Sequence, residues 1–213
     1  MAKVHPNAAV APEPSPAPPQ DQEVLTVWRK SLLFNCDGFT VFDASTGNLA
    51  FRVDCYASAR RRAEVVLMDS AGKPLLTVRR KRLSLAEHWV IYDGDAAAEP
   101  RSSSKPLLSV RRHVSLRASS KTLAHVTPLT SAGEAFVVEG SYGRRACAVR
   151  DARGDAVAQV QRKESPVGDD VFRLVAADPC RLGAPLAMGL VIALDEMFRG
   201  GASRSLLRRT WSA

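Results

Sequence analysis

One segment near the C-terminus, residues 184–198, is apolar on nearly every face of the helix that it would form. Pro185 suits the first turn of that helix, and Arg199, Gly200 and Gly201 predict its end. A helix without a polar face has to be surrounded by protein. Its apolar run is also shorter than the roughly 20 residues that cross a bilayer, so no transmembrane segment is predicted. The side chains predicted to be buried are those of Leu186, Met188, Leu190, Val191, Ile192, Leu194, Met197 and Phe198.

Most of the remaining chain predicts antiparallel β-hairpins. Three times, a β-prone run is followed by a turn that starts with Asp and ends with Gly, at residues 43–47, 69–72 and 151–154, and then by a second β-prone run. Asp can bond to the turn backbone, and Gly supplies the positive φ at which the chain reverses. Further short β-prone runs favour a barrel or a sandwich. Together with the buried helix they predict a mainly β fold, a barrel threaded by a helix.

The two ends of the chain differ from its middle in composition. Residues 1–22 are rich in proline and alanine and predict a disordered tail, residues 23–200 predict the barrel domain, and residues 201–213 predict a basic tail. There is no signal-peptide pattern, and the 4 cysteines lack metal or redox spacing, so they are expected to be small apolar fillers. These features favour a monomer in the cytoplasm, at the plasma membrane as a peripheral protein, or in the nucleus, and not a secreted protein.

Charge gives the main functional indication. With 30 Lys and Arg against 22 Asp and Glu, the chain carries a formal charge of +8, which favours an anionic partner. Cations cluster after two β-prone runs, at Arg79, Arg80, Lys81 and Arg82 and at Arg111 and Arg112. A barrel filled by a helix has little room for charge, so we expect the chain to leave the strand at the first cluster. These six residues are the candidate anionic-ligand site, and a solvated rim is the alternative interpretation.

No catalytic constellation is found. The 4 histidines lack metal spacing, and neither a phosphate-binding glycine loop nor a nucleophile elbow occurs. We therefore predict no enzyme activity, no cofactor and no metal site. Asp195 and Glu196, near the end of the apolar helix, are expected to form hydrogen bonds at the mouth of the barrel.

Several stretches resemble the plant LURP-one-related family over about residues 24–199; they are residues 25–35, 38–43, 47–54, 66–69, 72–81 and 188–198. The resemblance implies the tubby C-terminal-like fold, a twelve-stranded antiparallel barrel around one hydrophobic helix. It also implies a relation to phospholipid scramblases and to tubby proteins, which bind phosphatidylinositol bisphosphate and are regarded as membrane-tethered transcription regulators. Some LURP-one-related proteins are associated with plant defence.

These observations predict a non-enzymatic scaffold that binds phosphoinositide or an anionic membrane surface and has a role in plant defence. Two alternatives stay open. One is a nucleic-acid-binding transcriptional regulator that uses the same cations, although only 6% of the chain is aromatic and could stack on bases. The other is a protein-interaction module without a lipid role.

Overall fold

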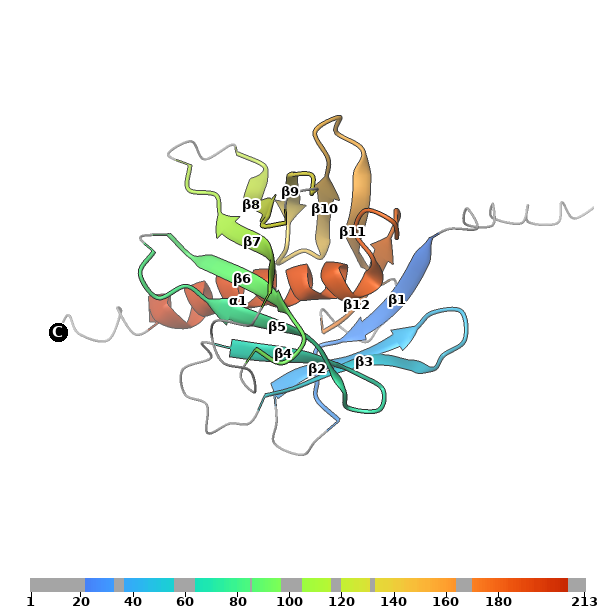
Figure 1. Cartoon of the computed structure of the whole chain (residues 1–213). Helices are drawn as coiled ribbons and strands as arrows, with labels where there is room; N and C mark the ends of the chain where they lie inside the picture. Colours follow the sequence, from blue (N-terminus) through green and yellow to red (C-terminus); the bar gives the residue numbers. More distant parts are fainter. Residues whose placement is uncertain are drawn as a thin grey trace, which may run out of the picture.

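Twelve antiparallel strands close into a barrel around one helix in the computed structural model (Figure 1). This confirms the predicted fold. The structure describes residues 22–32, 37–55, 64–84, 86–96, 105–115, 120–130, 133–163 and 170–206, without the side chains of Cys55 and of residues 199–206. The elements are β1 Glu23–Trp28, β2 Asp37–Asp43, β3 Leu49–Cys55, β4 Glu64–Asp69, β5 Pro74–Arg80, β6 His88–Asp93, β7 Pro106–Arg112, β8 Thr122–Pro128, β9 Phe136–Ser141, β10 Ala146–Arg150, β11 Ala156–Arg162, β12 Val171–Ala176 and α1 Ala184–Leu206.

Each strand pairs with its neighbour in sequence, and β1 closes the barrel by pairing with β12 as well as β2. The register of this closure runs from Glu23 opposite Ala176 to Trp28 opposite Val171. Because all pairs are antiparallel, the odd-numbered strands all end at one end of the barrel and the even-numbered strands at the other.

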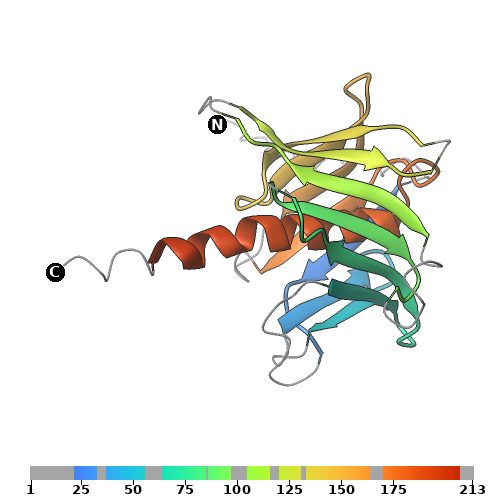
Figure 2. The ribbon, with the colours of Figure 1, turned by 60° about the vertical axis from the view of Figure 1, so that its left-hand side comes forward.

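The helix distinguishes these two ends. The backbone amide of Ala184, where α1 begins, donates to Glu23 Oε2 at the start of β1. Asp195 and Phe198 instead lie beside Arg29 and Arg112, which follow β1 and end β7. The last turns of α1 extend past the strands (Figure 2). We call this the helix-exit end; its described loops are residues 29–32, 81–87 without 85, 113–115, 120–121, 142–145, 163 and 170.

The opposite end, which we call the turn end, holds the loops that follow the even-numbered strands. The three predicted hairpins are confirmed as β2–β3, β4–β5 and β10–β11, so their Asp-to-Gly turns all lie at this end. Asp43 shows how such a turn is built: its carboxylate accepts hydrogen bonds from the backbone amides of Ser45 and Thr46 at 2.9 and 2.7 Å. Together with the hydroxyl of Ser45, which is the largest contribution, these bonds lower the pKa of Asp43 to about 2.

The core fills the space between the strands and the helix. Inward strand residues such as Val27, Val41 and Val78 are fully buried. On the helix, the side chains of Met188, Leu190, Val191, Ile192, Leu194 and Met197 are buried as predicted. Leu186 and Phe198 are only partly buried, which corrects the prediction, because they lie in the first turn of α1 and beyond the buried part, where the barrel opens.

Two further predictions are wrong. The helix does not end at Gly200 and Gly201 but continues to Leu206; each glycine costs about 1 kcal/mol in a helix, which is not enough to stop it when residues on both sides favour one. Cys147 is buried as predicted, but Cys180 is exposed, because it lies in the loop before α1 and not in a strand. Cys36 lies outside the described residues.

No run of the described part of α1 is apolar enough over sufficient length to cross a bilayer. The predicted N-terminal tail falls outside the description except for Gln22. Of the predicted basic tail, only the backbone of residues 201–206 is described.

Candidate anionic-ligand site

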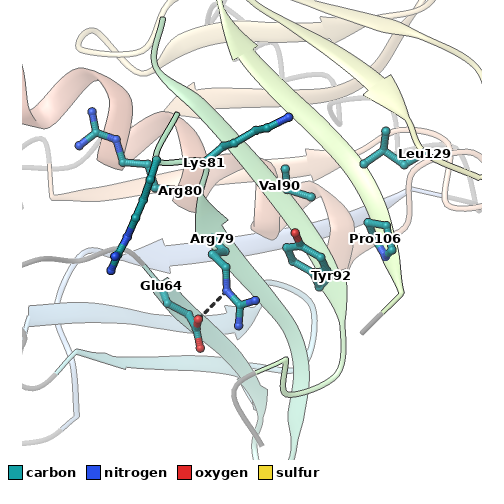
Figure 3. A pocket seen from close by; sticks show the side chains of 9 residues that line it. Glu64, Arg79, Arg80, Lys81, Val90, Tyr92, Pro106 and Leu129 are labelled. Carbon is teal, nitrogen blue, oxygen red and sulfur yellow. Dashed lines mark hydrogen bonds and ion pairs between the residues drawn. The ribbon is translucent and has the colours of Figure 1, made fainter. Parts of the chain in front are cut away.

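A pocket of about 510 Å³ opens on the outer face of the barrel, over β5, β6 and β7 (Figure 3). All four cations of the first predicted cluster line it. The remaining lining consists of one carboxylate and an apolar wall. The lining residues are Glu64, Arg79, Arg80, Lys81, Arg82, Val90, Tyr92, Pro106 and Leu129.

Arg79 is fixed in the wall of this pocket. Its strand neighbour Val78 points into the core, so Arg79 points outward. Its Nε donates to Glu64 Oε2 on β4 at 2.6 Å, and its Nη2 donates to the carbonyl of Ala96 at 3.0 Å. The guanidinium also lies 5.3 Å from the centre of the Tyr92 ring. Arg79 is therefore held in place, and Glu64 offsets its charge.

Arg80, Lys81 and Arg82 mark the end of the strand. β5 ends at Arg80, so the chain leaves the strand at this cluster as predicted. The side chain of Arg80 is 43% exposed and donates to Glu87 Oε1 at 2.7 Å. Lys81 and Arg82 are exposed, and neither has an ion pair with any described residue. They are the two cations of the pocket that are free to meet an anion.

The second predicted cluster is divided between two places. Arg111 is exposed and lies opposite His88 on β6. Burial is the main cause that lowers the pKa of His88, and the charges of Arg111 and Lys81 lower it further. Arg112 instead packs over the ring of Phe198 at 4.9 Å. The six predicted residues thus do not form one patch: Arg111 extends the basic outer face, and Arg112 belongs to the helix exit.

Sequence reasoning missed the apolar wall of the pocket. Val90, Tyr92, Pro106 and Leu129 come from β6, β7 and the loop after β8, and no spacing in the sequence brings them together. It also missed Leu83, which follows Arg82 directly and is 98% exposed. The sequence did contain a signal for this exposed side chain, because an apolar residue directly after a run of cations in a hairpin turn is expected to face solvent.

Other polar groups gather at the mouth of the barrel. Asp195 is buried and accepts a hydrogen bond from the hydroxyl of Tyr142 at 3.3 Å, as the position near the helix end predicted. Burial, and after it the charge of Asp195, raises the pKa of Tyr142 far above its usual value. These contacts form a buried polar layer beneath the helix exit, in which Arg29 Nε makes no hydrogen bond with a described residue but lies 3.8 Å from Asp195 Oδ1.

Two histidines also come together, one directly after β7 and one on β8. His113 Nδ1 and His125 Nε2 are 3.0 Å apart, a contact that their sequence spacing did not predict. Among the described residues, no group of three or more His, Cys, Asp and Glu side chains is placed to hold a metal ion.

Comparison with known proteins identifies the family. The model of the LURP-one-related family matches residues 23–195. LURP-one-related 8 of Arabidopsis thaliana is 41% identical over 206 residues, covering 93% of this chain and 99% of that protein. LURP-one-related 5 of the same plant is 40% identical, covering 84% of each chain.

A solved X-ray structure of an Arabidopsis thaliana protein shares the fold. Its TM-score is 0.56 at 23% sequence identity, and the match covers 82% of this chain and 90% of the other. The family model spans the whole barrel and the first half of its helix. The chain belongs to the LURP-one-related family.

Proposed function

We propose that this LURP-one-related barrel is a non-enzymatic scaffold that binds the phosphorylated head group of an anionic lipid in the pocket around residues 79–82. The observation that carries the proposal is which cations of the pocket already have an ion-pair partner and which have none among the described residues. Arg79 is fixed by Glu64 and Tyr92, whereas the exposed Lys81 and Arg82 have no ion pair among the described residues. Such cations contribute roughly 1 kcal/mol each near an anionic membrane, and Arg matches phosphate oxygens with two donors.

The shape of the site favours a compact head group over duplex DNA. The cations line one side of a concave pocket, and Val90, Tyr92, Pro106 and Leu129 line the other. A sugar ring can pack against such a wall while its phosphates meet Lys81 and Arg82. A DNA backbone would instead need cations spread over a longer surface. Family membership supports placing this activity at a membrane in plant defence, in line with the resemblance described above.

The test is co-sedimentation with phosphatidylcholine vesicles, with and without phosphatidylinositol bisphosphate, at about 0.15 M salt, where weak surface attraction is screened. The double variant Lys81→Glu, Arg82→Glu should bind the phosphoinositide vesicles at least about tenfold more weakly. It should also lose binding of inositol trisphosphate, measured by calorimetry. Lys73→Glu is the control, because Lys73 is an exposed cation in the β4–β5 turn, at the turn end.

Equal binding by the wild type and the double variant would contradict the assignment of the pocket. Binding of duplex DNA that falls steeply with salt, together with no vesicle binding, would support a nucleic-acid-binding regulator instead. If the chain bound neither lipid nor DNA, the basic outer face would be a solvated surface, and the protein-interaction module would be the better interpretation.

A further inference from the structure

The large apolar side chains that are exposed in the described residues gather at one end of the barrel. Trp28 ends β1 and is 45% exposed, and Leu32, which follows it, is 54% exposed. Leu83, after β5, is 98% exposed, and Val114, after β7, is 73% exposed. Because β1, β5 and β7 run parallel to one another, all four lie at the helix-exit end. The fifth such side chain, Leu129, follows β8 and lies at the turn end.

The two ends also differ in charge. At the helix-exit end, the two described loop acids are already paired: Glu87 with Arg80, and Asp170 with Arg29. At the turn end, the described loops carry five acids and four cations, so their charges nearly balance; the cations are Lys73, Lys105, Arg153 and Arg181. The exposed loop cations of the helix-exit end are Lys30, Lys81, Arg82, Lys121 and Arg144, and the loop acids of the turn end are Asp95, Glu134, Asp151, Asp155 and Asp178.

This arrangement matches the chemistry of an anionic bilayer surface. Among the described residues, these apolar side chains come from three different connections and have cations near them in the sequence, such as Lys30, Lys81 and Arg82, and they do not form one continuous apolar run. Separate apolar side chains can each insert into a bilayer, at the boundary between head groups and acyl chains, while neighbouring cations stay at the lipid phosphates. Tryptophan favours this interface, since its ring is apolar and its N–H is polar.

We propose that the helix-exit end is the membrane-facing surface of the protein, with Leu83, Val114, Leu32 and Trp28 entering the interface of an anionic bilayer. This proposal and the proposed function both involve an anionic lipid, but they concern different parts of the molecule. The pocket would select a particular head group, whereas the helix-exit end would bind the surface of any anionic bilayer. Lys81 and Arg82 connect the two, since they line the pocket and flank Leu83. The last turns of α1 extend from the same end (Figure 2).

The experiment uses the full chain and vesicles of phosphatidylcholine with phosphatidylserine and no phosphoinositide. Leu83→Ser should weaken vesicle binding about tenfold, because one exposed leucine no longer enters the interface. Ala71→Ser is the control, an exposed apolar residue in the β4–β5 turn at the opposite end and outside the pocket, and it should leave binding to these vesicles unchanged. Since both side chains are exposed, neither substitution should alter the melting temperature.

A second measurement reports insertion directly. Lipids with brominated acyl chains quench a tryptophan that enters the bilayer. To leave Trp28 and the buried Trp89 as the emitters, the full chain carries Trp211→Phe. The lipids should quench the emission of this chain, and adding Trp28→Phe should remove most of that quenching. Trp89 is buried in the barrel and supplies an unquenched background.

The inference is overturned if Leu83→Ser and Ala71→Ser bind phosphatidylserine vesicles equally, or if the quenching seen in Trp211→Phe persists when Trp28→Phe is added. Its failure is distinguishable from failure of the pocket. Inositol trisphosphate binding that is lost only in the Lys81 and Arg82 variant supports the pocket alone. A vesicle defect in Leu83→Ser with unchanged inositol trisphosphate binding supports the membrane-facing end.

Discussion

Individual arginine side chains in this barrel have different roles, which depend on the residue that each one contacts. Arg79 is neutralised by Glu64, Arg80 pairs with Glu87, and Arg112 packs on Phe198. The sequence was enough to locate these cations, because they are consecutive and follow a β-prone run. It was not enough to tell which of them are free, because their partners come from another strand, from the next turn or from the helix.

Asp151 illustrates a residue whose hydrogen bonds make stability depend on pH. Its carboxylate accepts hydrogen bonds from Arg181 Nη1 at 2.9 Å and from the backbone amides of Arg153 and Asp155. Burial raises the pKa of Asp151, but these bonds outweigh that effect and lower it to about 2, from a usual value of 3.8. The folded-state pKa lies below the unfolded value, so the contribution to stability is complete above about pH 4 and is lost between pH 4 and pH 2.

We therefore predict that the urea midpoint of the wild type falls between pH 4 and pH 2, and that Asp151→Asn makes this fall smaller. Asp155→Asn, at an exposed position of the same turn, is the control and should retain the wild-type pH dependence. Urea titrations followed by circular dichroism at pH 2, 3, 4 and 6 measure the effect. An equally steep fall in Asp151→Asn would show that other carboxylates dominate.

At the scale of elements, the helix and the wall of the barrel fit closely at one glycine. A Cβ atom on Gly189 would lie 3.3 Å from Ile91 Cδ1 and 3.4 Å from Leu76 Cδ1. Because Gly189 has no side chain, Ile91 of β6 and Leu76 of β5 pack directly against the backbone of α1. The sequence predicted that the helix is buried, because no face of it is polar. It did not predict which face touches which strand, since that depends on the tilt of the strands around the helix.

Gly189→Leu should lower the free energy of unfolding by about 1–3 kcal/mol, because the added side chain overpacks the contact with Ile91 and Leu76. Gly143→Leu is the matched control, since a Cβ there meets no atom within 4 Å, and it should change stability by at most about 0.5 kcal/mol. Urea denaturation of the three proteins gives both values. Equal stability of Gly189→Leu and the wild type would mean that the barrel can widen around the helix.

At the scale of the whole molecule, the repeated hairpins made the barrel predictable from the sequence. The closed antiparallel barrel also has two ends that differ in their loops. Three Asp-to-Gly turns join even-numbered strands to odd-numbered ones, so an antiparallel barrel places all of them at one end. Four of the five large apolar side chains that are exposed in the described residues, and the basic loops, then lie at the other end. The pocket was less predictable, because its wall combines residues from β6, β7 and the loop after β8.

Closure of the barrel depends on β1, which joins the first half of the chain to the last strand. β1 pairs with β12 over Glu23–Trp28 and with β2 from Leu25 to Trp28, and its side chains of Leu25 and Val27 are buried against the helix-filled core. Removing β1 would leave β2 and β12 with unpaired edges and expose the core between them. Residues 1–21 precede this strand, and we expect the domain to begin at about residue 23.

We predict that a chain starting at Gln22 unfolds at the same urea concentration as the full chain, within error. A chain starting at Arg29, which lacks β1, should show no cooperative unfolding transition and should aggregate through its open edges. Urea denaturation and size-exclusion chromatography of the three chains provide the comparison. A lower midpoint for the chain starting at Gln22 would place stabilising contacts in the proline-rich segment. A folded monomer without β1 would show that the barrel does not need its closing strand.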